Sequence, residues 1–537
     1  MACSKLYLPA ELIVEIIQYF HYDYKTLHSC ILVNRLWCRL TIPLLWEDPF
    51  SMKYPKNYHF IEIYLHNLND DDKSKLSDYG INNDLFSSNT LFNYPEFIQQ
   101  LNTNKVHNSI KNWIKAIRRP SSNFIYKSSL HLISRLLFLI FIENEVSLHS
   151  FEVIIDAEEK YYVDSSIVLI LQKPNFIRNI KNLTLNLNRI SHNISKFLIF
   201  FHSNCNSISS LYFQFLHKHG HDDHLKTEKL LSQIINSQEN LRKITFYHHN
   251  LYSLYHSLLS LKNPNCLNTL KTIIFYRVYL NDVVVLSEVL NQLNNLESVH
   301  IIYCNFLDTK FINNIINTTK PFKLKSLFWN NEILESIELL MQKSGNYLEN
   351  FGNGHCYNFQ LLKLLKSYCG NIKFLHLHNG LNVQNIVSTF DLIEINKQSL
   401  NYLYIDATCN GIEESELSSI VLQKLGQILP FKMEYLDLSL KIDINDLELF
   451  LRNSQNTYIK KLLIKYSKTE ENEDILPYIK EYIMKKKRVK YLNILEKPYG
   501  ELFLLKDEVK EFKLHGIQVL KYYDLHIDID VFIKEII

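Results

Sequence analysis

The stretch Ile180-Lys181-Asn182-Leu183-Thr184-Leu185 decides the fold, because its pattern, apolar-x-x-apolar-x-apolar, recurs along most of the chain. The other clear copies are Ile208-Leu211-Phe213, Leu241-Ile244-Phe246, Leu270-Ile273-Phe275, Leu296-Val299-Ile301, Leu324-Leu327-Trp329, Ile372-Leu375-Leu377, Leu400-Leu403-Ile405, Met433-Leu436-Leu438, Ile459-Leu462-Ile464 and Val489-Leu492-Ile494. A weaker copy lies at Leu348-Phe351, and Leu148-Phe151-Val153 precedes the run. Successive copies are roughly 23 to 33 residues apart, which overlaps and slightly exceeds the spacing of leucine-rich repeats.

Each copy predicts a short strand whose alternate side chains point inward, followed by an amphipathic helix that returns the chain. The clearest helical patterns are Asp282–Leu293, Asn331–Met341, Asn358–Ser367 and Glu414–Leu429. Since alternating strands and helices require parallel strands, we expect an α/β leucine-rich repeat solenoid, a curved right-handed horseshoe with the strands on its concave face. The asparagine that usually follows the strand is mostly missing, Asn188 aside. A doubly wound α/β sheet is the alternative, although so many similar units exceed an ordinary open sheet.

Residues 8–46 predict three short helices. Pro9 and Glu11 suit the first turn of the first helix. Its apolar residues share one stripe at helical spacing, namely Leu12, Ile13, Ile16, Ile17 and Phe20. Leu27, Ile31 and Leu32 predict a second helix, and residues 36–46 a third that Pro43 interrupts. Because so small a core cannot bury all these side chains, part of the apolar surface should stay exposed until a partner covers it.

The same residues resemble the F-box family. The motifs are Leu8-Pro9-Ala10-Glu11-Leu12, Leu32-Val33-Asn34-Arg35-Leu36-Trp37-Cys38 and Pro43-Leu44-Leu45-Trp46. They agree with the family in order and spacing over about residues 5–50. The resemblance implies a three-helix module that binds the Skp-type adaptor of a cullin-RING ubiquitin ligase. It marks as adaptor-binding residues Leu8, Pro9, Glu11, Leu12, Ile16, Leu32, Val33, Arg35 and Trp37.

The predicted domains are therefore an F-box at 1–50, a connector at 51–145 and irregular leucine-rich repeats at 146–537. Within the connector, residues 69–89 are polar and predict a flexible loop. Helical apolar spacing follows at 95–101, 110–117 and 130–141, with a break at 118–122. We expect these helices to cap the first repeat, because an uncapped solenoid would expose its core.

Composition places the chain among globular proteins, with 47% hydrophobic and 21% charged residues. A formal net charge of +2 gives no global electrostatic reason to expect nucleic acid or an anionic membrane as a partner. The nine cysteines are scattered without a C-x-x-C pair, as expected for reduced thiols of a cytoplasmic or nuclear protein. The most apolar window, 136–142, is much shorter than the ~20 residues of a spanning helix, so no membrane segment is expected.

Several residue clusters could carry chemistry. His217, His219, His221 and His224 have side chains that bind zinc, copper or nickel, but a solvated polar loop is the preferred interpretation. Gly352 and Gly354 are not followed by a phosphate-binding helix pattern. The basic run 485–488 lies beside a repeat strand and predicts a solvated helix end rather than an import signal. We find no catalytic arrangement and expect neither cofactor nor metal.

The resulting interpretation is a non-catalytic adaptor. Its F-box would bind the Skp-type adaptor, and its repeats would hold an unknown protein substrate for a cullin-RING ubiquitin ligase. Aromatic anchors are expected after the strands, at Tyr276, Tyr303, Trp329, His378 and Tyr466. The alternatives are an F-box protein with a non-degradative assembly role, a repeat scaffold whose first helices form only a cap, and an enzyme with a metal centre in the histidine stretch.

Overall fold

The structure is a computed structural model that describes residues 8–21, 23–52, 55, 57–86, 90–117, 123–155, 160–187, 191–215, 221–248, 254–280, 283–305, 309–329, 335–353, 359–378, 381–408, 414–468, 474–498 and 500–536. The chain forms two compact units. Unit 1 comprises Met1–Lys271 with Gln292–Asn295, and unit 2 comprises Thr272–Asn291 with Leu296–Ile537.

Unit 1 begins with helices. They are α1 (Ala10–Tyr19), α2 (Tyr24–Cys30), α3 (Arg35–Leu45), α4 (Phe60–Leu65), α5 (Asp70–Asp78), α6 (Thr103–Ile117) and α7 (Asn123–Glu143), with short 3-10 turns at Pro49–Ser51, Asn83–Leu85 and Tyr94–Phe97. The three predicted N-terminal helices are all present, and α1 starts directly after Pro9. The expected break at Pro43 is wrong, because α3 continues through it. Pro43 removes the hydrogen bond to the carbonyl of Arg39, and since Arg39 is exposed, water is available to that carbonyl.

The connector differs from expectation in two places. Residues 70–78 form α5 rather than a loop, because Asn69 caps the helix by accepting from the Asp72 amide at 2.8 Å and acidic residues favour a first turn. The helix expected at 95–101 is also wrong. A 3-10 turn is followed there by strand β1 (Gln100–Asn102), which pairs with the first repeat strand. The expected break at 118–122 lies outside the described residues.

Helix α7 is long and apolar enough to span a membrane by length and composition, over 19 residues from Ile125 to Glu143. This stretch exceeds the apolar window apparent in the sequence. More than half of it is buried, and α7 packs against α4, α5, α6 and α8 (Lys160–Ile170). Phe141, for example, is buried and meets Tyr64 edge to face with ring centroids 5.3 Å apart. These contacts are those of a core helix.

The repeats of unit 1 alternate strands and helices. The strands are β2 (Ser150–Ile155), β3 (Asn182–Leu187), β4 (Ser210–Phe215) and β5 (Lys243–His248). Between and after them lie α8, α9 (Asn175–Arg178), α10 (His192–Asn204), α11 (His221–Ser237), α12 (Tyr255–Ser260) and α13 (Pro264–Thr269). Neighbouring strands pair in parallel and in chain order. One buried apolar row runs across them, through Phe151, Leu183, Leu211 and Ile244.

Unit 2 continues the alternation with longer strands toward its end. Its strands are β6 (Thr272–Tyr276), β7 (Ser298–Ile302), β8 (Leu324–Trp329), β9 (Asn350–Asn353), β10 (Phe374–Leu377), β11 (Tyr402–Asp406), β12 (Lys432–Ile442), β13 (Tyr458–Lys468) and β14 (Val489–Glu496). The helices between them are α14 (Val283–Gln292), α15 (Thr309–Ile316), α16 (Glu335–Ser344), α17 (Phe359–Tyr368), α18 (Ile386–Ile395), α19 (Glu414–Ile428), α20 (Ile444–Asn453) and α21 (Leu476–Ile479). The helices predicted near 282, 331, 358 and 414 are confirmed within the described residues.

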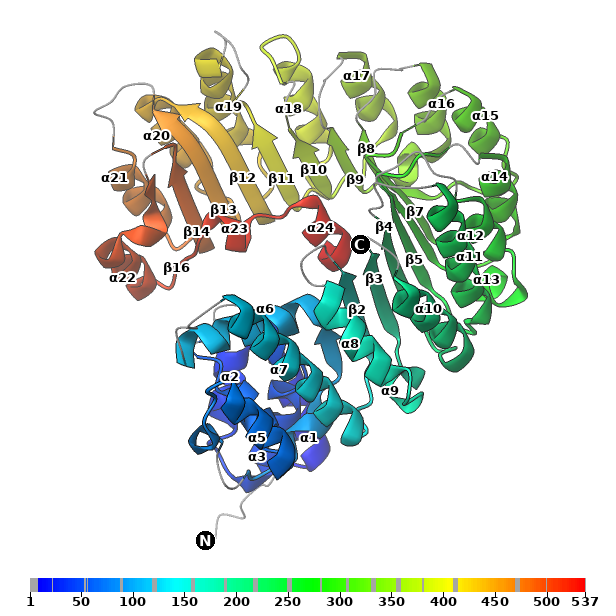
Figure 1. Cartoon of the computed structure of the whole chain (residues 1–537). Coiled ribbons are helices and arrows are strands. Elements are labelled where there is room, and N and C mark those ends of the chain that lie inside the picture. Colours follow the sequence, from blue (N-terminus) through cyan, green and yellow to red (C-terminus); the bar gives the residue numbers. More distant parts are fainter. Residues whose placement is uncertain are drawn as a thin grey trace, which may run out of the picture. The chain divides into compact units, whose positions relative to one another are not determined.

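Every predicted strand pattern coincides with an observed parallel strand. From β8 to β14 the fourth residue of each copy forms one buried ladder, Leu327, Phe351, Leu375, Leu403, Leu436, Leu462 and Leu492. Helices α15 to α20 lie on one side of this sheet (Figure 1). Since strand order never reverses within a unit, the arrangement is that of an α/β repeat solenoid rather than a doubly wound sheet.

The last part of unit 2 does not follow the repeat. After β14 come β15 (Gly500–Glu501), a 3-10 turn (Leu502–Leu504), α22 (Lys506–Leu514), β16 (Gln518–Val519), α23 (Tyr522–Leu525), α24 (Ile529–Val531) and a π-helical turn (Phe532–Ile536). β16 pairs with β14, and from there the chain crosses the side of the sheet opposite α17 to α20 (Figure 1). We call residues 518–536 the C-terminal strap and the side that it crosses the helix-free face.

Candidate interaction surfaces

Helix α1 divides its apolar residues between a buried stripe and an exposed one. Ile13 and Ile17 are buried and form a small cluster with Leu27 of α2. Leu12 and Ile16 each precede a buried residue by one position, a rotation of about 100° round the helix. They remain 45% and 38% exposed. The predicted single stripe therefore supplies both the core of the three helices and an apolar surface.

The turn between α2 and α3 adds to the exposed apolar surface. Leu32 and Val33 are 74% and 58% exposed, and Leu36 in the first turn of α3 is 43% exposed. Asn34 caps α3, because its side-chain oxygen accepts from the Trp37 amide at 3.0 Å. This cap fixes the direction in which the chain enters α3, and with it the position of the two residues before the cap.

The core beneath these residues is small. The cluster of Ile13, Ile17 and Leu27 is completed only by partly buried side chains, namely Phe20, Trp37, Leu40, Leu44 and Leu45. Around it lie seven exposed large apolar side chains: Leu8, Leu12, Ile16, Tyr19, Leu32, Val33 and Leu36. We call these seven residues the N-terminal apolar set. Exposed apolar side chains gathered in so short a stretch are typical of surfaces that contact another molecule.

Most of the residues that the F-box resemblance marked are on this surface. Exposed are Leu8, Pro9, Glu11, Leu12, Ile16, Leu32, Val33 and Arg35. Trp37 differs, because its ring packs against the cluster of Ile13, Ile17 and Leu27. Its position favours a supporting role for Trp37 and a contact role for the eight others.

The helix-free face of unit 2 carries a row of polar and aromatic residues. Because side chains alternate along a strand, the residue after each ladder leucine faces the other way. The row runs in register through Phe328, Gly352, His376, Tyr404 and Asp437. Phe328, Tyr404 and Asp437 are buried and His376 is partly buried, although they lie on the side of the sheet without helices. The C-terminal strap is the element that covers them.

Hydrogen bonds to a buried carboxylate hold the middle of the strap. Asp437 is fully buried, and its Oδ2 atom accepts from the Tyr522 hydroxyl at 3.2 Å and lies 2.9 Å from His526 Nδ1. The Tyr435 hydroxyl donates to the same oxygen at 2.8 Å and accepts from the Ile527 amide at 3.2 Å. A buried carboxyl group needs such partners, and the strap supplies two of them, Tyr522 and His526, beside Tyr435 from the repeats.

Aromatic packing holds the end of the strap. The Phe532 ring is fully buried, with centroid distances of 5.0 Å to Phe328 and 4.4 Å to Phe374. Gly352 makes this packing possible, because a Cβ atom there would lie 2.3 Å from the Phe328 ring. The weak repeat copy in β9 therefore has glycine where its neighbours carry larger side chains.

A second hydrogen-bonded carboxylate, that of Asp406, lies near the strap. Asp406 pairs with His378 at 3.2 Å and accepts from the Thr408 hydroxyl at 2.6 Å. Burial alone would raise the pKa of Asp406, but these hydrogen bonds lower it to about 2. The neighbouring His376 ring stacks on Tyr404 at 4.4 Å, and burial lowers the pKa of His376 to about 3. Asp406 is therefore charged and His376 neutral at pH 7.

The residues expected to anchor a substrate occupy different environments. Tyr276, Trp329 and Tyr466 are buried, at 3%, 2% and 4% exposure. Tyr303 is partly buried and packs edge to face on Phe328 at 5.7 Å, with burial raising its pKa to about 12. His378 has the most open side chain of the five, 40% exposed and paired with Asp406.

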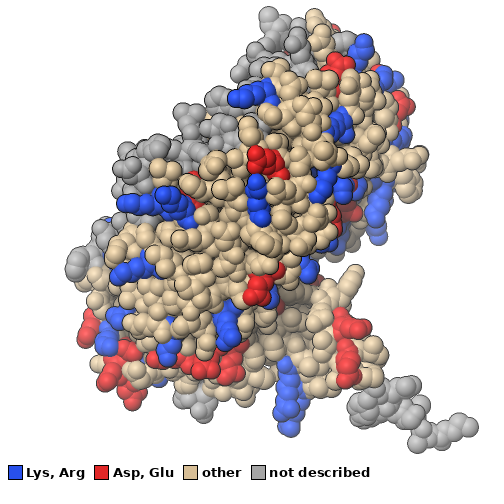
Figure 2. Space-filling model, turned by 90° about the vertical axis from the view of Figure 1, so that its right-hand side faces the viewer, with Lys and Arg blue, Asp and Glu red and all other residues tan. Residues whose placement is uncertain are grey.

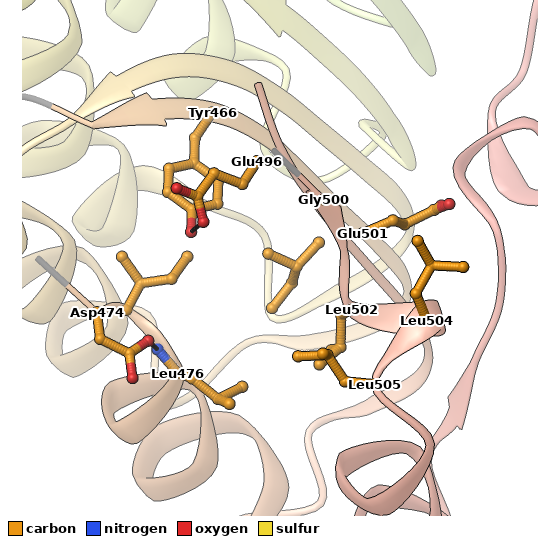
Figure 3. A pocket seen from close by; sticks show the side chains of 11 residues that line it. Tyr466, Asp474, Leu476, Glu496, Gly500, Glu501, Leu502, Leu504 and Leu505 are labelled. Carbon is orange, nitrogen blue, oxygen red and sulfur yellow. Dashed lines mark hydrogen bonds between the residues drawn. The ribbon is translucent and has the colours of Figure 1, made fainter. Parts of the chain in front are cut away.

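An open cavity of about 360 Å³ lies at the carboxyl ends of β13 and β14 (Figure 3). Its lining is apolar with three carboxylates and consists of Tyr466, Asp474, Ile475, Leu476, Ile494, Glu496, Gly500, Glu501, Leu502, Leu504 and Leu505. The Tyr466 hydroxyl donates to Glu496 Oε2 at 3.0 Å. Sequence reasoning missed this cavity, because its lining combines residues of β13 and β14 with residues of the two segments that follow these strands.

The other candidate chemical features gain no support from their surroundings. Of the histidine stretch, 216–220 lie outside the described residues, and His221 and His224 belong to the first turn of α11 rather than to a loop. Among the described residues no group of three or more His, Cys, Asp or Glu is placed to hold a metal. Gly352 packs against Phe328, and Gly354 lies outside the described residues.

The described cysteines are unpaired thiols, as expected. Cys30, Cys205, Cys266, Cys304 and Cys369 are buried, and Cys38 is partly buried. Burial raises the pKa of Cys266 to about 11 and that of Cys304 and Cys369 to about 12. Such thiols stay protonated at neutral pH and are poor nucleophiles.

Charge is distributed without a dominant sign. Figure 2 shows one face of the molecule, on which basic and acidic side chains are interspersed and uncharged surface separates most of them. The near-neutral net charge of +2 agrees with this pattern. Neither the face shown in Figure 2 nor the net charge points to a broad field of one sign.

Comparison with known proteins does not assign the chain: no protein-family model matches it, and no curated protein sequence matches it.

Proposed function

We propose that this chain is the substrate-recognition subunit of a Skp-cullin-F-box type ubiquitin ligase. The N-terminal apolar set would bind the Skp-type adaptor, and the repeats would bind the protein to be modified. One observation carries the proposal: eight of the nine residues that the F-box resemblance marks for adaptor binding are exposed, and five of them are large apolar side chains.

Exposed apolar side chains cost free energy that a partner can recover by covering them. Each large apolar side chain that moves from water to a protein interface contributes about 1.5–3 kcal/mol. Leu12, Leu32 and Val33 are 45%, 74% and 58% exposed. Ile13 and Ile17, which lie on the same helix as Leu12, are buried. A sequence that needed only a stable cap could place polar residues at the exposed positions. An apolar surface on so small a helical core therefore favours a partner that covers it.

The proposed role is positioning rather than bond chemistry. Holding a target lysine near a conjugating enzyme raises its effective concentration without any catalytic group on this chain. The transferase step would belong to other subunits.

Affinity capture tests the proposal. The tagged full chain is compared with a Leu12→Asp, Val33→Asp variant, and the Skp-type adaptor and cullin are read by mass spectrometry. Both positions are exposed, so the substitutions should leave the fold intact while placing two charges in an apolar interface. The matched control is Leu514→Asp, Tyr523→Asp, which changes two apolar residues in unit 2 that are 86% and 88% exposed.

The proposal expects adaptor and cullin with the parent chain and the control, and neither with the N-terminal variant. Adaptor without cullin would indicate an assembly role outside degradation. Absence of the adaptor from all three samples, under conditions in which another F-box protein captures it, would contradict the proposal and favour a plain repeat scaffold.

A further inference from the structure

The amino ends of β12, β13 and β14 lie next to one another at one end of the sheet in unit 2. The carbonyl of Phe431, just before β12, accepts from the Tyr458 amide at 2.9 Å. The carbonyl of Arg488, just before β14, accepts from the Ile459 amide at the same distance. Since neighbouring strands are about 5 Å apart, these positions span about 10 Å. The residues at the amino ends of the three strands therefore form one continuous surface.

Two large aromatic side chains stay exposed on this surface. Phe431 is 78% exposed and Tyr458 is 39% exposed. The apolar residues that begin the two repeat copies, Met433 and Ile459, are buried. Because Phe431 and Tyr458 lie outside the repeat pattern, their rings contribute less to the core and are available to a partner.

Exposed lysines occupy the neighbouring positions. Lys432 is the first residue of β12, and Lys490 is the second residue of β14. Lys486 and Lys487 lie in the turn between the π-helical turn Lys480–Met484 and β14. All four lysines are exposed. We call the six residues the basic edge: Phe431, Lys432, Tyr458, Lys486, Lys487 and Lys490.

The carboxylates beside the basic edge are already paired with other lysines. Glu434 lies 2.8 Å from the Lys460 ammonium, and Glu481 lies 2.5 Å from the Lys485 ammonium. In the part of the chain that the structure describes, the four lysines of the basic edge have no ion-pair partner. Their positive charge is therefore not compensated within the chain.

A buried cation adds to this charge. Arg488, only 6% exposed, donates from Nε to the Tyr482 carbonyl at 2.9 Å and from Nη1 to the Ser454 carbonyl. These acceptors are uncharged, so they hold the guanidinium without neutralising it. Burial lowers the pKa of Arg488 to about 10, which still leaves it charged at pH 7. The basic edge is therefore a local positive surface on a chain whose net charge is close to zero.

We propose that the basic edge binds a segment of the target protein in which Asp or Glu residues flank a large apolar side chain. The carboxylates lie against Lys432, Lys487 and Lys490, and the apolar side chain rests on Phe431 and Tyr458. A surface about 10 Å across matches three or four extended residues. A protein segment fits better than nucleic acid, because a net charge of +2 offers a long polyanion little attraction beyond these three strands. The inference rests on the proposed function for the identity of the occupant as a target protein.

Fluorescence anisotropy with the purified full chain and no adaptor tests the inference, in low salt to limit screening of exposed charges. The probe is a fluorescein-labelled peptide, Gly-Asp-Glu-Leu-Glu-Asp-Gly. Two matched peptides replace either the four acidic residues by lysine or the leucine by glycine. A labelled short oligothymidine serves as the nucleic-acid probe. We expect saturable binding of the acidic peptide and weaker binding of the other three probes.

A charge variant tests the lysines. Lys432→Gln, Lys487→Gln removes two exposed charges and should weaken binding of the acidic peptide by about fivefold, the effect of losing two exposed ion pairs. Its control is Lys310→Gln, Lys363→Gln, at exposed lysines of α15 and α17. The control should change binding by less than about twofold.

A ring variant tests the apolar contact. Phe431→Ser should weaken binding of the acidic peptide by about threefold or more, because the leucine of the peptide loses the ring on which it rests. The control is Tyr523→Ser, at an aromatic residue of the strap that is 88% exposed, and it should leave binding unchanged. Substitution at such exposed positions should preserve the fold.

Absence of binding by the acidic peptide would overturn the inference, as would equal binding by the charge variant and its control. Oligothymidine that binds more tightly than the peptide, and loses affinity in the charge variant, would replace the protein segment by nucleic acid. None of these results depends on the adaptor, so failure here is distinct from failure of adaptor capture.

Discussion

The N-terminal helices and the helix-free face of unit 2 treat apolar and aromatic surface in opposite ways. In the first, Leu12, Leu32 and Val33 remain exposed beside a small core. In the second, the C-terminal strap covers the sheet so completely that Phe328 is fully buried. From the sequence, the repeats were expected to hold the substrate and the N-terminal helices to be the docking module.

The difference shows how to distinguish structural from interacting surface in one chain. Where the chain possesses a segment that can cover an apolar face, as Phe532 covers Phe328 and Phe374, it uses that segment. Where apolar side chains stay exposed instead, as on the N-terminal helices, a partner that covers them is the simplest explanation of their exposure.

The largest effect is expected at the strap. Phe532→Ala should destabilise unit 2 by about 4 kcal/mol, because a fully buried ring is removed from between Phe328 and Phe374. Hydrogen exchange of peptides from β10 to β12 measures the loss. Tyr523→Ala, at an 88% exposed strap residue, is the control and should change stability by less than about 0.5 kcal/mol. Equal protection in the two variants would mean that the strap does not cover this face in solution.

A smaller effect separates the two stripes of α1. Ile17→Ala should cost about 3 kcal/mol, because Ile17 is fully buried in the cluster with Ile13 and Leu27. Ile16→Ala, one position earlier, should cost less than about 0.5 kcal/mol because Ile16 is exposed. Exchange rates of α1 amides provide the measurement. Similar losses for both would show that the exposed stripe is packed in solution.

Acid should weaken the covered face through His376. Its folded pKa of about 3 lies below the unfolded value near 6.5, so the unfolded state binds the proton and stability falls as pH drops below about 6.5. Between pH 6.5 and 5 this loss is about 1.6 kcal/mol. His376→Phe keeps the stacking on Tyr404 and should remove that part of the pH dependence, as measured by urea denaturation at the two pH values. If the free energy of unfolding depends on pH in the variant as it does in the parent chain, a group other than His376 causes the dependence.

The smallest effect concerns the cap of α3. Asn34→Ala should cost about 1 kcal/mol, since the Trp37 amide loses its acceptor, whereas Asn34→Ser should retain most of the stability. Thermal melting of the full chain followed by circular dichroism compares the two. If the alanine variant is as stable as the serine variant, the cap does not organise the turn that carries Leu32 and Val33.

The repeats were predictable because their determinants are local. A six-residue pattern with a return helix specifies a parallel strand, and even the weak copy at Leu348-Phe351 forms β9. The α5 helix was missed because its signal is a cap and acidic first turn rather than apolar periodicity, with Leu76 as its buried apolar residue. Such a helix resembles a loop in composition.

The strap and the cavity could not be predicted because their contacts join distant residues. Tyr522 and His526 meet Asp437 across 85 and 89 positions, and no local pattern links them. One signal was present: Asp437 lies in the middle of an apolar strand, where an acidic side chain requires a buried partner. The sequence could indicate that a partner exists without indicating which residue it is.

The most direct test of the account is a calorimetric titration of the purified Skp-type adaptor into the purified full chain. We expect saturable one-to-one binding with a negative heat-capacity change, because apolar side chains such as Leu12 and Val33 become buried. It also predicts loss of that signal in the Leu12→Asp, Val33→Asp variant and its retention in Leu514→Asp, Tyr523→Asp. Absence of binding by the parent chain, or equal binding by both variants, would contradict the claim that the exposed N-terminal residues form a docking surface for the adaptor.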